Sequence, residues 1–216
     1  MGREVHAKTK AVYEDPRIVE EYFQVYAKTM DRELALAFVN SLSAGRRVLD
    51  LGCGPGHYTG LLSELGAQMT GLDYSNTMIA KAKGVAPAAT FVVGDMFELN
   101  SIFAENSFDG IWANASLLHM QADEVDEMLS SMRHVIKPDG KVYIRVKEGV
   151  FGTRVVEENV YGQTIEREFL FWDEKHLNEA LTRNGFVTDR LERQRKTYSH
   201  REGEIDWLRV WATAKK

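Results

Sequence analysis

The residues best suited to chemistry in this chain are acidic side chains at the ends of three apolar stretches. Asp50 interrupts the run Val48-Leu49-Asp50-Leu51, Asp73 closes a second run, and Asp95 follows a third. A carboxylate at the end of a buried strand is costly unless a polar group meets it there. Since carboxylates accept hydrogen bonds, three acids in order at one edge of a sheet indicate a ligand site rather than three separate structural roles.

Three glycines directly follow the first acid. Gly52, Gly54 and Gly56 alternate with Cys53 and Pro55. Glycine has no Cβ, so a ligand can lie directly against the backbone. The pattern predicts a strand-to-helix turn that binds a small cofactor at the carboxyl end of a parallel sheet.

The spacing of the glycines bears on which cofactor binds. The dinucleotide fingerprint G-x-G-x-x-G requires a third small residue, and His57 occupies that position here. An acid about twenty residues after the glycines, such as Asp73, binds ribose hydroxyls in dinucleotide enzymes as well. The turn therefore argues against a nicotinamide-dependent oxidoreductase without excluding it.

Strands alternate with helices along most of the chain, which predicts an α/β fold: a single, doubly wound, mostly parallel seven-stranded sheet with helices on both faces. The last two strands are joined by a polar turn, so we expect a C-terminal antiparallel hairpin. The expected strands are 46–51, 68–73, 90–93, 108–113, 140–147, 186–194 and 206–214, and the expected helices are 57–66, 75–83, 122–136 and 173–184.

Two further segments complete the expected organisation. Residues 1–45 carry aromatic side chains at helical spacing and predict a helical lid or substrate segment before the main domain, 46–216. Residues 148–171 match no clear element. A long connection in a compact domain is often a functional lid, so this segment is a possible substrate lid.

The stretch Asp50-Leu51-Gly52-Cys53-Gly54-Pro55-Gly56 resembles the first motif of the class I S-adenosylmethionine-dependent methyltransferases, of the small-molecule type. Asp73 to Met78, Gly94-Asp95-Met96 and Ile136 to Ile144 resemble later motifs of that family. The resemblance covers 46–147 well and 173–214 loosely. It implies a Rossmann-like fold, methyltransferase activity, S-adenosylmethionine as cofactor and S-adenosylhomocysteine as product.

The resemblance also implies which residues bind the cofactor. Asp73 would accept from the ribose and Asp95 from the adenine amino group, while Tyr74 or Met78 would cover one ring face. Backbone groups near Ala113 and Asn114 would hold the methionine portion. The expected set is Asp50, Gly52, Gly54, Gly56, Asp73, Tyr74, Met78, Asp95, Met96, Ala113 and Asn114.

Methyl transfer from a sulfonium needs alignment above all, and a base only where the acceptor must lose a proton. His119 is the candidate base, since an imidazole titrates near neutral pH (~6.5); the alternative is a packing role. Arg145 and Lys147 predict either a positive floor for an anionic substrate or salt bridges with an acid such as Glu148. Tyr22 and Tyr26 would line the substrate pocket, unless their stripe is ordinary core.

Composition and charge exclude some partners. The chain has 216 residues and a formal net charge of −5, and no basic face indicates nucleic acid. Asn114 is not followed by the Pro-Pro motif of adenine N6-methylases. The histidines have no metal-site spacing, and no apolar run is long enough to span a bilayer. We therefore expect a cytoplasmic enzyme acting on an oxygen or nitrogen of a small molecule, and the oligomeric state stays open. The remaining alternative is a non-catalytic S-adenosylmethionine-binding partner subunit.

Overall fold

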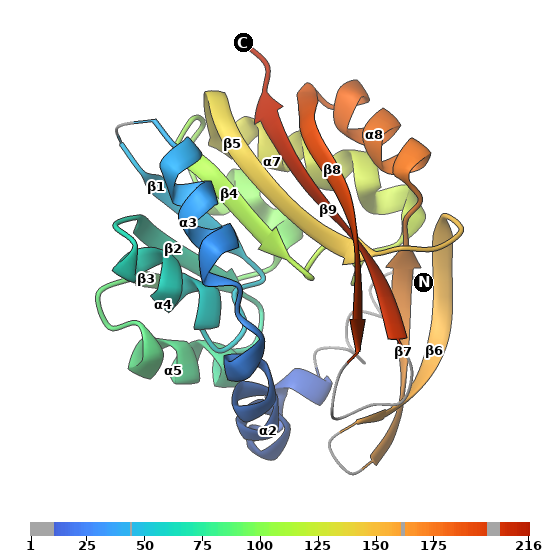
Figure 1. The fold of residues 1–216 in the computed structure, drawn as a ribbon. Helices are drawn as coiled ribbons and strands as arrows, with labels where there is room; N and C mark the ends of the chain where they lie inside the picture. The colour runs from blue at the N-terminus through green and yellow to red at the C-terminus, as the bar shows by residue number, and fades with distance from the viewer. Residues whose placement is uncertain (1–10, 44, 161–162, 198–203) are drawn as a thin grey trace.

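A seven-stranded sheet forms the centre of the computed structural model, which describes residues 11–43, 45–160, 163–197 and 204–216 (Figure 1). The strand order is β3-β2-β1-β4-β5-β9-β8. Strands β1 to β5 are parallel, and β9 is antiparallel to both of its neighbours. The strands are β1 (Arg47–Leu51), β2 (Gln68–Asp73), β3 (Thr90–Val93), β4 (Phe108–Asn114), β5 (Ile136–Lys147), β8 (Phe186–Thr197) and β9 (Glu204–Ala214). The predicted mostly parallel sheet with a C-terminal antiparallel pair is confirmed.

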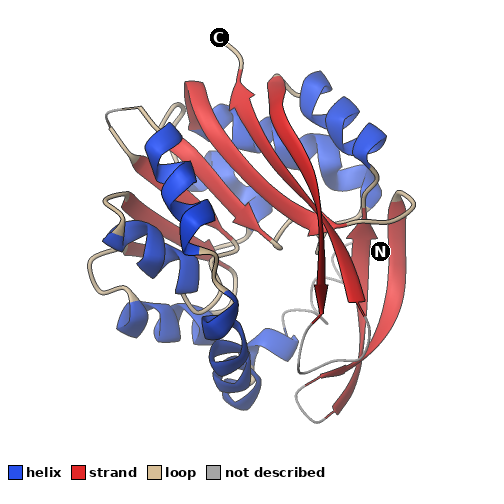
Figure 2. Ribbon diagram, in the orientation of Figure 1, coloured by secondary structure: helices blue, strands red, loops and turns tan. Residues whose placement is uncertain are grey.

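Helices cover both faces of the sheet (Figure 2). The α-helices are α2 (Pro16–Tyr26), α3 (Arg32–Ser41), α4 (His57–Glu64), α5 (Asn76–Val85), α6 (Leu99–Ile102), α7 (Val125–Val135) and α8 (Glu174–Arg183), and the 3-10 helices are η1 (Ala27–Thr29), η2 (Met96–Glu98) and η3 (Ala122–Glu124). Ser75 and Asp173 cap α5 and α8 through their side chains. Both helix starts agree with the sequence.

Two apolar clusters bury the two faces of the sheet. One joins Leu49 and Ile111 to Met128 of α7, and the other joins Phe38 of α3 to Trp112 and Tyr143. Trp112 and Tyr143 are fully buried and stack with their ring centroids 4.1 Å apart. This two-sided burial fixes the strand ends in place, and the site lies at those ends.

The fourth expected helix and the strand after it differ from the prediction. The helix was expected over 122–136, but the chain forms η3 first and α7 ends at Val135. The strand was expected from 140, yet β5 begins at Ile136, which pairs with Phe108. Ile136 is fully buried, so it joins the sheet as soon as the helix ends. Pro138-Asp139-Gly140 then forms a bulge in which Asp139 has φ 63°.

The unassigned segment 148–171 forms a two-stranded antiparallel sheet of its own. Its strands, β6 (Gly152–Val160) and β7 (Gln163–Phe171), make what we call the β6–β7 arm. The arm extends from the carboxyl end of β5 and returns to it, since Trp172 N donates to Lys147 O at 2.9 Å (Figure 1). Charged residues interrupt both strands and hide them from a search for apolar runs: Arg154, Glu157 and Glu158 in β6, and Glu166, Arg167 and Glu168 in β7.

The helical prediction for 1–45 holds for α2, η1 and α3, while residues 1–10 and 44 lie outside the described residues. Within the part of the chain that the structure describes, no helix is long and apolar enough to cross a membrane.

Candidate functional site

The glycine turn joins β1 to α4 in a left-handed backbone conformation. Gly52 has φ 70° and Gly54 has φ 52°. A Cβ on Gly52 would lie 2.5 Å from Ser116 Cβ, whereas a Cβ on Gly54 would meet only Met78 Sδ, at 4.0 Å. Gly52 therefore lets the loop after β4 pack against the turn, and Gly54 leaves open space above the backbone.

Asp73 at the end of β2 is bonded to the same turn. One carboxylate oxygen, Oδ2, accepts from Gly54 N at 2.9 Å, and the other, Oδ1, accepts from Ser75 N at 2.9 Å. Burial raises the pKa of Asp73 to about 6, although these backbone hydrogen bonds favour the ionised form. Each oxygen keeps a lone pair, so the carboxylate can still accept two hydrogen bonds from a ligand.

Asp50 is buried in β1, with 3% of its surface exposed. Its Oδ2 accepts from Thr59 Oγ1 at 2.6 Å, which ties the strand to the first turn of α4. Burial, helped by the charge of Asp73, raises the pKa of Asp50 to about 7. The Asp50 carboxyl therefore changes charge near neutral pH. A cationic ligand bound beside it would favour the ionised form.

The chain turns sharply after β4. Ala115 has φ 61°, a conformation that costs a non-glycine residue about 1–2 kcal/mol and often marks a functional site. On either side of it, Asn114 Oδ1 and Ser116 Oγ are buried, and neither has a hydrogen-bond partner among the described residues. Both atoms are placed to meet polar groups of a ligand.

Two adjoining cavities open at these strand ends. The β2 cavity has a volume of about 490 Å³, part of which is open to solvent, and is lined by Asp73, Tyr74, Met78 and Met96 among others. The β5 cavity has a volume of about 940 Å³, also partly open to solvent, and is lined by Asp50, Arg145 and Lys147 among others. The residues that line both are Tyr13, Tyr22, Gly52, Gly54, Asn114, Ala115 and His119. A ligand in one cavity can therefore reach a ligand in the other.

The structure brings most of the predicted cofactor residues to these cavities. Three of them, Gly56, Asp95 and Ala113, are not among the described residues that line either cavity, and their binding role stays a prediction. Gly56 packs against Ala82, whose Cβ would lie 2.9 Å from an added Cβ. Asp95 accepts from Phe97 N at 3.1 Å and caps η2, and Ala113 is fully buried within β4.

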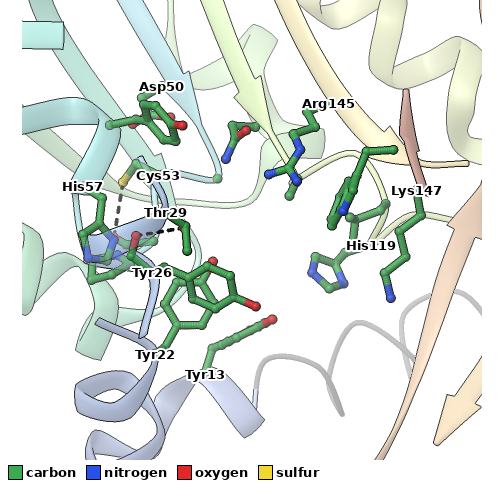
Figure 3. A pocket seen from close by; sticks show the side chains of 18 of the residues that line it. Tyr13, Tyr22, Tyr26, Thr29, Asp50, Cys53, His57, His119, Arg145 and Lys147 are labelled. Carbon is green, nitrogen blue, oxygen red and sulfur yellow. Dashed lines mark hydrogen bonds between the residues drawn. The ribbon is translucent and has the colours of Figure 1, made fainter. Parts of the chain in front are cut away.

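The predicted acceptor residues all line the β5 cavity: Tyr22, Tyr26, His119, Arg145 and Lys147. Figure 3 shows Arg145, Lys147 and His119 across the cavity from the three tyrosines Tyr13, Tyr22 and Tyr26. Glu148, the salt-bridge partner considered from the sequence, accepts instead from Arg193 Nε at 2.6 Å.

The N-terminal segment is anchored over both cavities. Ser75 Oγ donates to Tyr13 O at 2.7 Å, and the Glu14 carboxylate accepts from the backbone N–H groups of Asn76 and Thr77 at 3.1 and 3.2 Å. Burial would raise the pKa of Glu14, but these hydrogen bonds hold it below its usual value. The start of α5 therefore holds the Tyr13 ring against the shared wall.

Several lining residues escaped the sequence analysis or entered it only as open candidates. Phe169 and Trp207 were missed, and Arg167 lines the β5 cavity with them. Arg167 and Phe169 are two apart on β7, so they share one face of the strand. Recognising 163–171 as a strand would have placed both beside the cavity.

The comparisons with known proteins agree with this geometry. A family model described as a methyltransferase domain matches residues 48–140. An uncharacterized methyltransferase of Synechocystis sp. is 36% identical over 100 residues, 46% of this chain and 46% of that protein. Trans-aconitate 2-methyltransferase of Delftia acidovorans is 35% identical over 109 residues, 50% of this chain and 40% of that protein. The match thus spans less than half of each relative.

A solved structure extends the likeness to the whole fold. The 1,6-didemethyltoxoflavin-N1-methyltransferase of Burkholderia thailandensis, determined with 1,6-didemethyltoxoflavin and S-adenosylhomocysteine, aligns with a TM-score of 0.72 and 23% identity. The alignment covers 100% of this chain and 91% of that one. Residues 48–140 are thus similar to a methyltransferase domain, and the chain has the fold of the class I S-adenosylmethionine-dependent methyltransferases.

Proposed function

We propose that this protein transfers the methyl group of S-adenosylmethionine to an oxygen or nitrogen of a small-molecule acceptor. The observation that carries the proposal is the junction of the two cavities at His119, Asn114 and the glycine turn. One cavity has the polar groups that a nucleoside needs, and the other is large enough for a second small molecule.

The residues of the β2 cavity fit an adenosyl group. Asp73 has free lone pairs for two ribose hydroxyls, and Tyr74, Met78 and Met96 offer apolar surface to a ring. Asn114 Oδ1 and Ser116 Oγ can bond to the polar end of the cofactor. Asp50 would balance the positive charge of an amino acid moiety or a sulfonium.

When bound, S-adenosylmethionine supplies a methyl group on a sulfonium, whose S–C bond breaks with its electron pair left on sulfur as the acceptor atom bonds to the carbon. The protein's task is then alignment, because the leaving group is already activated. His119 lines both cavities and would take the proton from an acceptor O–H or N–H.

Two segments outside the methyltransferase domain would complete the acceptor site. The N-terminal segment, 1–45, contributes Tyr13, Tyr22 and Tyr26, and the 148–171 segment contributes Arg167 and Phe169. We infer that both act as walls over the acceptor, so that water is kept from the reacting atoms. The named activities of the relatives, which include a phosphoethanolamine N-methyltransferase, an O-methyltransferase and a sterol 24-C-methyltransferase, support a small-molecule acceptor, and oxygen or nitrogen as the accepting atom rests on the position of His119.

Calorimetric titration with S-adenosylmethionine, S-adenosylhomocysteine and NADH tests the proposal. We expect micromolar binding of both adenosyl ligands and at least a hundredfold loss in Asp73→Asn, whose amide cannot accept on both sides. Asp189→Asn, an exposed acid on the far strand β8, is the control and should bind normally. Tight binding of NADH alone would identify an oxidoreductase. Adenosyl binding without turnover of any acceptor in a broad screen would identify a binding subunit.

A further inference from the structure

His119 lies on the loop that follows β4 and borders both cavities. Its backbone N–H donates to Ser116 O at 3.1 Å, which fixes the main chain of the loop. The imidazole can still rotate about two side-chain bonds. A base removes a proton only when its ring nitrogen lies within about 3 Å of the atom that carries the proton, so neighbouring side chains must hold the ring in one orientation.

Two aromatic rings contact the His119 imidazole from different segments of the chain. The Phe169 ring of β7 lies 5.3 Å from it, centroid to centroid, with the two planes at 43°. The Tyr13 ring of the N-terminal segment lies 5.9 Å away at 75°, in a T-shaped pair (Figure 3). Both distances fall in the range of stabilising aromatic pairs. The N-terminal segment therefore contacts the candidate base as well as forming part of the cavity wall.

Tyr13 is itself held at both ends. Its carbonyl oxygen accepts from Ser75 Oγ at 2.7 Å, and its hydroxyl accepts from Arg167 Nη1 at 2.5 Å. Between these two hydrogen bonds the ring packs against Tyr22 in a second T-shaped pair, with the centroids 6.0 Å apart. A residue that only formed a wall would need surface contact alone. Hydrogen bonds at both ends also fix the direction in which the ring points, because such bonds are directional.

One of these hydrogen bonds connects Tyr13 to the cavity assigned to the cofactor. Ser75 is fully buried, and it donates through its backbone N–H to Asp73 Oδ1 at 2.9 Å and through Oγ to Tyr13. A contiguous set of contacts thus runs from Asp73 through Ser75 and Tyr13 to His119. The position of the Tyr13 ring therefore depends on the same turn that is proposed to bind the ribose.

We propose that Tyr13 is a positioning residue, whose ring fixes the orientation in which His119 takes the proton from the acceptor. The inference rests on the proposed function, which assigns the base to His119. It gives the N-terminal segment a part in the reaction, because the base is correctly oriented only when this segment lies against α5 and the β6–β7 arm. Tyr13 acts through His119 and needs no contact with the reacting atoms.

NMR spectroscopy of the histidine rings tests the positioning without an acceptor. In protein made with isotope-labelled histidine, the ring signals of His119 and His57 are assigned by their loss in His119→Asn and His57→Asn. Tyr13→Leu keeps the carbonyl that accepts from Ser75 but removes the ring. It should move the His119 signal, since the ring current of the neighbour is lost, and leave the His57 signal in place. Tyr13→Phe keeps the ring and should leave the His119 signal close to its original position.

Phe23→Leu is the matched control, because it removes a ring of the same segment that stacks on a different histidine. Phe23 lies 4.7 Å from His57, with the planes at 12°. This variant should move the signal of His57 and leave that of His119. Movement of both signals in Tyr13→Leu would show a general loosening of the segment, and an unmoved His119 signal would show that the ring does not hold the base. Either result overturns the proposal.

A double variant shows whether Tyr13 acts through the base. With an acceptor from the screen that carries an O–H or N–H group, Tyr13→Leu should lower kcat roughly tenfold, a part of the roughly 10² to 10⁴ that a positioned base contributes. Tyr13→Phe should keep most of kcat, and the KM for S-adenosylmethionine should change less than kcat does. In the His119→Asn background Tyr13→Leu should cause no further loss, because the group that it positions is gone.

A further loss of kcat in the double variant would mean that Tyr13 acts directly on acceptor or cofactor, and would overturn the proposal. The proposed function fails by a different result, the absence of binding of both S-adenosylmethionine and S-adenosylhomocysteine. In that case the histidine signals of the free protein still decide whether the Tyr13 ring orients His119.

Discussion

The two cavities of this protein are built in different ways. The β2 cavity is formed by the ends of β1, β2 and β4 and one turn, and its key groups are backbone amides, short acids and open space above glycine. The β5 cavity is formed by long side chains that come from Tyr13 at one end of the chain to Trp207 near the other. Under the proposed function, this division would let the cofactor site be kept while the acceptor site changes with the segments around it.

Because the β2 cavity is formed by backbone and short side chains, we expect small changes in the glycine turn to have the largest effects on stability and ligand affinity. Gly52→Ala places a methyl group 2.5 Å from Ser116 Cβ at a backbone φ of 70°. Strain and overpacking together should lower the free energy of unfolding by about 3 kcal/mol. Displacement of the turn should weaken S-adenosylhomocysteine binding by a hundredfold or more (about 2.7 kcal/mol). Urea unfolding and calorimetry measure the two effects.

Gly84→Ala is the control for this change. Gly84 lies in α5 and an added Cβ would meet nothing within 4 Å, so alanine should stabilise the helix by up to about 1 kcal/mol. If Gly52→Ala were as stable as Gly84→Ala and bound the ligand normally, the turn would not be the rigid part of the site.

The same difference between the two cavities explains which parts of the structure can be predicted from the sequence. The glycine turn, Asp50 and Asp73 lie at the ends of apolar runs, so the local pattern is enough to place them. The order of the sheet follows from the alternation of strands and helices, because parallel strands need crossovers. These parts of the fold depend on residues that are neighbours along the chain.

The acceptor side depends on neighbours in space. The sequence did not predict that Trp207 of β9 would lie beside Arg145 or that Phe169 of β7 would lie beside Lys147. Phe169 and Trp207 read as ordinary strand residues in the sequence, since nothing local reveals which face of a strand borders a cavity. For Gly56, Asp95 and Ala113 the situation is the opposite. These residues match a sequence motif, but they are not among the described residues that line either cavity.

A second prediction concerns the residue where the cavities meet. His119→Asn should reduce turnover of an acceptor that carries an O–H or N–H group by roughly a hundredfold at pH 7, because proton removal by a positioned base contributes about 10² to 10⁴ in rate. Affinity for S-adenosylhomocysteine should change less than threefold. A loss of turnover below threefold would mean that His119 is not the base.

A third prediction concerns how the free energy of unfolding depends on pH through the two buried carboxyl groups. The pKa of Asp50 is about 7 in the folded protein and that of Asp73 about 6, both above the ordinary value of 3.8. The folded chain therefore keeps protons that the unfolded chain has released between about pH 4 and 7. The free energy of unfolding should fall as pH rises through this window, by up to about 1.4 kcal/mol per unit for each group, and level off above pH 7.

Asp50→Asn isolates the share of Asp50, since an amide oxygen can still accept from Thr59. Between pH 5 and 7 its stability should fall less steeply than that of the original protein. Burial lowers the pKa of His57, which acts in the opposite direction below pH 6.5, but this contribution is the same in both proteins and cancels in the difference. Urea midpoints at half-unit steps measure it. Equal slopes would show that Asp50 is ionised throughout, contrary to its burial.

The smallest expected effect lies at the contact between the two walls of the acceptor site. Tyr13 belongs to the N-terminal segment and Arg167 to the β6–β7 arm, and their hydrogen bond joins elements 154 positions apart in the sequence. Tyr13→Phe removes the hydroxyl and keeps the ring. It should lower the free energy of unfolding by about 1 kcal/mol, the usual net value of one hydrogen bond.

A double-mutant cycle with Arg167→Gln decides whether that contact matters for binding. If the two walls close as a unit, the variants should couple by about 1 kcal/mol in the affinity for the acceptor, and each should speed its dissociation. Their effects on S-adenosylhomocysteine should be smaller, because in the proposed function that ligand binds to Asp73 and the glycine turn. Simple additivity in both affinities would mean that the walls act independently, and that the acceptor cavity is shaped by β5 and β9 rather than by the two segments that cover it.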